Sequence, residues 1–179
     1  MQILSSFEKQ VKNALKWYDD PEQLGNESPL ASPYFLSRSI DDRVEPTSAR
    51  VRGEALRRVL REAAATLWSG TLPRSLDEMR RALVEVRQQP GTRNYSYIVI
   101  ELRAIRQFLR PRRTADIWDS EEYLPGSRAE HYRDFDVAVQ HLGEALLRYL
   151  HPSLRPERPP QSAIVGYESA RANAEEILR

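Results

Sequence analysis

The chain has 179 residues, enough for one ordinary domain and a tail. Its 27 basic and 26 acidic residues nearly cancel, which excludes a strong global field for nucleic acid, so any such role must come from local charge. The absence of cysteine excludes disulfides and thiolate metal sites and fits a reducing compartment. Because the N-terminus lacks a signal-peptide pattern and no apolar run approaches the ~20 residues of a membrane span, we expect a cytoplasmic protein without membrane contact.

The N-terminal part predicts one helix followed by a long loop. Ser5 and Glu8 have the spacing of a capping box, and apolar residues at alternating spacings of three and four follow them. We therefore expect a helix over residues 5–18, ended by the Asp19-Asp20-Pro21 run. Residues 26–46 contain three prolines and many Ser and Asp residues. They predict mostly loop, with short turns near Leu30 and at Phe35–Leu36 that dock on the core.

A second helix is expected to begin after a cap at Thr47 or Ser48 and to end near Trp68, with Gly70 as its C-terminal stop. Its predicted apolar face consists of Val51, Ala55, Val59, Ala63 and Leu67. Another capping-box spacing, between Ser75 and Glu78, predicts a third helix that continues to Pro90-Gly91.

Strand propensity and periodicity disagree in the segment NYSYIVIELRAIRQFLR. The piece YSYIVI has the composition of a strand. Over the longer segment, apolar residues alternate by three and four, a register that only a helix aligns on one face. We therefore predict a helix over residues 95–109, whose aligned residues are Tyr95, Ile98, Leu102, Ile105 and Leu109.

The C-terminal half of the predicted domain contains two further helices. A basic break around Pro111 is followed by a short helix over residues 114–123 and by a long one from about residue 128 to residue 150. The apolar stripe of the long helix is Tyr132, Phe135, Val139, Leu142, Leu146 and Tyr149. Together with the preceding long helix, it predicts a core that includes Leu102, Ile105, Phe135, Leu142 and Leu146.

These elements predict an all-α bundle of about six helices over residues 1–151. Residues 151–160 contain four prolines and cannot continue a helix. Residues 152–179 are therefore expected to be a loosely packed, Pro-rich linker with a short terminal helix.

The sequence contains no motif that indicates a catalytic or metal site. There is no Gly-rich phosphate loop, and His131, His141 and His151 are ten residues apart, a spacing that does not bring them together on one helix turn. The acidic residues between positions 116 and 122 are interpreted as a solvated helix face. We therefore expect no enzyme, no metal and no cofactor.

The last two helices have the length and connection of a helix-turn-helix unit. They are joined by Leu124-Pro125-Gly126-Ser127, and in such units the second helix enters the major groove with its N-terminal residues at the base edges. Ser127 would cap that helix and offer free amides to a phosphate. The basic residues before the unit would bind the DNA backbone. The candidate DNA-binding residues are Arg110, Arg112, Arg113, Ser127, Arg128, His131 and Arg133.

This stretch resembles the recognition helix of the sigma-factor region-4 and LuxR-like helix-turn-helix class. The likeness rests on Ser127-Arg128 and Tyr132-Arg133, followed by Ala138 and Leu142, eleven and fifteen residues after the serine. The apolar stripe lies one residue later than in that class, so the helix would be rotated. The resemblance implies double-stranded DNA as the partner and a role in transcriptional regulation or DNA sensing.

A second, broader resemblance is to the N-terminal segments of large bacterial signal-transduction NTPases of the STAND class. It rests on ALKWYDDPEQLGNESPLA, ALRRVLREAAATLW and SRAEHYRDFDVAVQHLGEALL, in this order, and on RPPQSAIVGYESA, which is similar to the entry of the ATPase module. It implies that the chain is a module of a longer regulator or a stand-alone relative.

Two functions stay open at the level of the sequence. The candidate helix mixes Arg128, His131 and Arg133 with Glu130, Asp134 and Asp136, whereas DNA-reading helices usually have a cleaner basic face. One interpretation is a DNA-binding regulatory module. The other is a protein-interaction or autoregulatory adaptor domain whose partner is a protein or a downstream ATPase module.

Overall fold

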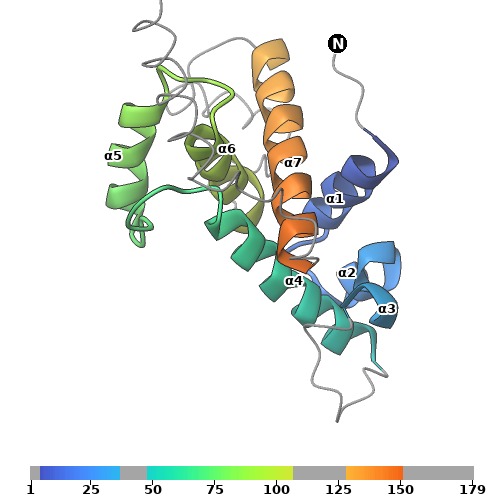
Figure 1. The fold of residues 1–179 in the computed structure, drawn as a ribbon. Helices are drawn as coiled ribbons and strands as arrows, with labels where there is room; N and C mark the ends of the chain where they lie inside the picture. Colours follow the sequence, from blue (N-terminus) through green and yellow to red (C-terminus); the bar gives the residue numbers. More distant parts are fainter. Residues whose placement is uncertain (1–4, 37–47, 107–127, 151–179) are drawn as a thin grey trace, which may run out of the picture.

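The computed structural model describes residues 5–36, 48–106 and 128–150, and within these ranges the chain is helical and contains no strand (Figure 1). The elements in chain order are α1 (Ser6–Lys16), α2 (Pro21–Glu27), η1 (Pro29–Ala31), α3 (Pro33–Leu36), α4 (Ala49–Ala65), α5 (Leu76–Val86), α6 (Arg93–Ile100), the π-helical turn η2 (Glu101–Ile105) and α7 (Arg128–Leu150). The predicted helix over residues 114–123 and the tail over residues 152–179 lie outside the described residues.

Two long helices, α4 and α7, organise the bundle. Helix α7 packs against α6, α4 and α1, and α2 lies along the N-terminal half of α4 (Figure 1). Helix α5 packs on α6 at the edge of the molecule. None of the helices in these ranges is both long enough and apolar enough to cross a membrane.

Local signals set most helix ends as predicted. Both predicted capping boxes are formed, by Ser5 with Glu8 and by Ser75 with Glu78. Ser48, one of the two predicted caps, accepts a hydrogen bond from the amide of Val51 at the start of α4. Gly70, the predicted stop, has φ 102°, a conformation that an L side chain rarely adopts, but α4 ends before it, at Ala65 with Thr66 as its C-cap.

The segment YSYIVI is helical, as its longer periodicity predicted. All residues of α6 from Tyr95 to Ile100 are buried, so the helix is enclosed on every side. An enclosed helix needs apolar residues all round, which explains why its composition resembles that of a strand. Directly after it, the backbone widens into the π-helical turn η2, a rare element that is often found at functional sites.

The predicted core is confirmed. Leu102, Leu142 and Leu146 are buried, while Ile105 and Phe135 are partly buried and pack against the same cluster. The short turns after residue 26 also dock as expected, since Leu30 and Leu36 are buried.

Three details of the prediction are wrong. No helix was expected directly after Asp20, but its side chain caps the N-terminus of α2, and Pro21 takes the first helical position. Val51 is 48% exposed because α4 turns Gly53, Leu56 and Leu60 toward the core instead. Tyr132 and Tyr149, at the two ends of the α7 stripe, are also exposed, at 45% and 39%.

Candidate nucleic-acid interface

Of the candidate DNA-binding residues, only those at the start of α7 fall in the described part of the chain. Arg110, Arg112, Arg113 and Ser127 lie outside it. Arg128 is the first residue of α7, but its side chain is also outside the described parts. Arg133 is exposed, and His131, two residues earlier and on another face, is half-buried. The structure therefore places two of the predicted side chains on the first turns of this helix.

The acidic residues of the same turns are bound to other helices. The hydroxyl of Tyr95, on α6, donates a hydrogen bond of 2.8 Å to the carboxylate of Asp134. Burial, followed by this contact with Asp134, raises the pKa of Tyr95 well above its ordinary value, so the phenol stays protonated as the donor. Asp134 thus serves the packing of α7 on α6.

Asp136 has a partner on the first helix of the chain. The Nζ atom of Lys12 lies 2.5 Å from an oxygen of the Asp136 carboxylate and 5.9 Å from the ring centroid of Phe135. The two side chains are partly exposed, so we expect the pair to contribute little to stability. Its consequence is electrostatic, because the charge of Asp136 is compensated within the fold.

Arg103, in the π-helical turn η2, contacts the first turns of α7. Its guanidinium donates a hydrogen bond of 2.9 Å to the backbone carbonyl of His131 and lies 4.8 Å from the ring centroid of Phe135. Burial lowers the pKa of Arg103. The sequence analysis did not single out this residue, although an arginine between Leu102 and Ile105 in an apolar register is a signal that could have indicated it.

Two more polar contacts fix α7 against α6. Ser96 and the Nδ1 atom of His141 share a hydrogen bond of 2.8 Å, and burial lowers the pKa of His141. Arg93 binds Glu144 at 3.1 Å. His141 is therefore occupied in packing, and no group of three or more His, Asp or Glu residues in the described ranges could hold a metal ion.

A buried ion pair lies at the other end of η2. Arg106 Nε is 3.0 Å from the Glu101 carboxylate, and the same guanidinium donates to the backbone carbonyl of Arg74 at 2.7 Å, which ties η2 to the chain before α5. Burial raises the pKa of Glu101, and the charges of Arg106 and Arg61 oppose this rise. The carboxylate therefore depends on Arg106 for its charge.

Replacing Arg106 with methionine is expected to lower the free energy of unfolding by about 1–3 kcal/mol at neutral pH, because it leaves the buried Glu101 charge without its closest partner. The loss should shrink as the pH falls. The pKa of Glu101 is raised in the folded chain, so the folded state takes up a proton first and gains stability relative to the unfolded state. Urea melts at neutral and mildly acidic pH measure both effects.

The control for this experiment is the double variant with Glu101→Gln. It removes the charge that Arg106 compensates, so the pH dependence of the loss should disappear. A loss that is the same at both pH values in the single variant would contradict the role given to Glu101.

Comparisons with known proteins add no assignment. No family model matches the chain, and neither a curated protein nor a solved structure matches it significantly. The function must therefore be argued from the site itself.

Proposed function

We propose that this chain is a non-enzymatic regulatory module that binds duplex DNA through the first turns of α7. One observation carries the proposal: Asp134 and Asp136 are bound to Tyr95 and Lys12, while Arg133 is exposed on the same turns. Two of the three acidic residues that made the helix look mixed in charge therefore have partners inside the fold: Lys12 compensates the charge of Asp136, and the neutral hydroxyl of Tyr95 binds the Asp134 carboxylate. The surface left to a phosphate backbone is more basic than the sequence indicates.

The basic residues before α7 would complete the interface. In this proposal Arg110, Arg112 and Arg113 bind the DNA backbone, and Ser127 and Arg128 begin the helix that enters the major groove. His131 lies two residues before Arg133, on another face of α7 and half-buried, so in this proposal it contributes at the edge of the interface. Glu130 is exposed and opposes binding, so we expect moderate affinity with a strong dependence on salt.

Fluorescence anisotropy with a duplex of about 20 base pairs, at ~50 and ~200 mM salt, tests the proposal. Arg112→Gln and Arg133→Gln should each weaken binding to all duplexes and lower the salt slope by about one unit, because each removes a phosphate contact. Arg87→Gln serves as the control, since Arg87, like Arg133, is exposed but lies at the end of α5. Absence of binding to any duplex at the lower salt concentration would refute DNA binding.

A protein-interaction module is the second candidate, and the exposed aromatic residues favour it. Tyr132 stands next to Arg133 on α7, and tyrosine with arginine is a combination enriched at protein interfaces. Tyr34 is 93% exposed on α3. If DNA binding is absent, loss of partner binding in Tyr132→Ala, with an unchanged melting temperature, would support this function.

A further inference from the structure

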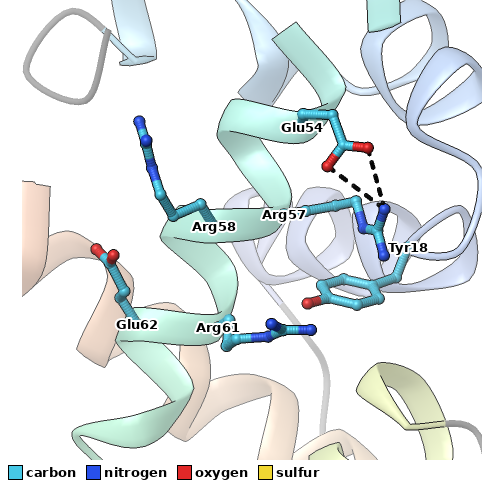
Figure 2. Close-up of a pocket in the computed structure, with 6 residues that line it drawn as sticks. All are labelled: Tyr18, Glu54, Arg57, Arg58, Arg61 and Glu62. Carbon is cyan, nitrogen blue, oxygen red and sulfur yellow. Dashed lines mark hydrogen bonds and ion pairs between the residues drawn. The ribbon is translucent and has the colours of Figure 1, made fainter. Parts of the chain in front are cut away.

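A pocket of about 360 Å³ lies along α4, on a part of the molecule that the DNA-binding proposal does not use. Its size is within the range of small-molecule sites in proteins. Figure 2 shows that it combines one tyrosine, from the turn after α1, with charged side chains of α4. The lining residues are Tyr18, Glu54, Arg57, Arg58, Arg61 and Glu62.

The tyrosine is buried, yet its hydroxyl has no partner in the described residues. Tyr18 is 1% exposed, and its hydroxyl points toward α4 between Arg57 and Arg61 (Figure 2). The hydroxyl oxygen is not among the enclosed, unsatisfied polar atoms of the described residues, so it is open to the pocket that it lines. The Tyr18 hydroxyl is thus a polar group aimed into the pocket, and a ligand oxygen would satisfy it.

The two glutamates of the pocket already accept from the protein. Arg57 Nη1 lies 3.3 Å from a Glu54 oxygen, and its guanidinium carbon is 5.2 Å from the ring centroid of Tyr18. Glu62 accepts a hydrogen bond from the hydroxyl of Tyr149, a contact that raises the pKa of this phenol. Both carboxylates are therefore engaged, and they do not need a cation from solution.

Arg61 is the basic group best placed for a ligand. Its guanidinium lies beside Tyr18 in Figure 2, is exposed, and makes no hydrogen bond to the described residues, although its charge acts on Glu101. The lining as a whole contains three arginines against two glutamates. Guanidinium groups bind oxyanions through paired N–H donors, which are strong hydrogen bonds because both partners are charged.

We propose that this pocket binds a small organic phosphate, in which Arg61, Arg57 and the Tyr18 hydroxyl donate to the phosphoryl oxygens. The donors come from α4 and from the turn after α1 and approach from different directions, which suits a tetrahedral group better than a flat carboxylate. The volume exceeds what an inorganic phosphate fills and leaves space for an organic group against Tyr18 and α4. The pocket contains no residue from the first turns of α7, so the proposal of phosphate binding does not depend on the proposal of DNA binding.

Isothermal titration calorimetry of the full chain with phenyl phosphate, inorganic phosphate and benzoate tests the ligand class. Phenyl phosphate should bind most tightly, inorganic phosphate more weakly, and benzoate least. No heat from phenyl phosphate at ligand concentrations up to ~10 mM would overturn the proposal, because affinity weaker than this is below that of a specific small-ligand site. Equal or tighter binding of benzoate would overturn the preference for phosphate.

Two variants test the named donors. Tyr18→Phe removes only the hydroxyl and keeps the packed ring. Arg61→Gln removes the charge at an exposed position. Each variant should weaken phenyl phosphate binding about tenfold or more, because each removes a hydrogen bond to a charged group. The control is Arg81→Gln, at an exposed arginine on α5, which should bind as the unchanged chain does. Melting curves establish that each variant is folded. Binding that is unaffected in folded Tyr18→Phe and Arg61→Gln would show that the ligand lies elsewhere and would overturn the proposal.

Discussion

Replacing Gly53 with alanine is expected to lower the free energy of unfolding by about 3 kcal/mol, although a glycine-to-alanine change inside a helix ordinarily stabilises it by up to ~1 kcal/mol. An added Cβ at Gly53 would lie 1.7 Å from the carbonyl oxygen of Pro21 and 2.6 Å from its carbonyl carbon. These are backbone atoms of α2, so the clash can be relieved only if α2 and α4 move apart. A urea melt of the variant measures the loss.

The chain contains a matched control for this prediction. Gly143 also lies within a helix, α7, but an added Cβ there would meet only side-chain atoms of Phe7 and Glu8, at 3.6 Å or more. Gly143→Ala should therefore show the ordinary helical gain of about 0.5–1 kcal/mol. If Gly53→Ala and Gly143→Ala change stability in the same direction, the close packing of α2 on α4 is incorrect.

Leu142→Ala is expected to cost about 2–5 kcal/mol, the second large effect, because it opens a cavity in the centre of the core. Leu142 is fully buried in α7, and its cluster includes residues of α1, α4 and α6. Residues from four helices would have to move together to fill the cavity, so the structure can close it only in part and most of the cost remains. Denaturant melts monitored by circular dichroism measure the change.

Val84→Ala gives the comparison for an apolar side chain outside the core. Val84 lies in α5 and is 59% exposed. Shortening it should alter stability by less than about 0.5 kcal/mol. A loss below about 1 kcal/mol for Leu142→Ala would contradict the assignment of the α7 stripe to the core.

The sequence predicted only part of the arrangement of charged residues in the first turns of α7. The exposed arginine and the helix itself follow from the sequence, since Arg133 lies off the stripe that Phe135, Val139 and Leu142 form. The partners of the Asp134 and Asp136 carboxylates cannot be predicted from the sequence. Their partners, Tyr95 and Lys12, are 39 and 124 residues away in the chain, so only the packing of α6 and α1 on α7 reveals that these carboxylates are bound within the fold.

The sequence by itself determined the helical class, the starts of α1, α4 and α5, and the centre of the core. These depend on interactions within a few residues: Ser5 with Glu8, Ser75 with Glu78, the positive φ at Gly70, and apolar spacings of three and four. Val59, Ala63 and Leu67 are buried as the spacing predicted. Only the tertiary structure shows that Gly53 and Leu56 are buried in place of Val51, and where the pocket along α4 lies. The contact of Gly53 with Pro21 and the position of Tyr18 beside Arg57 join separate helices, and no local pattern encodes the distance between them.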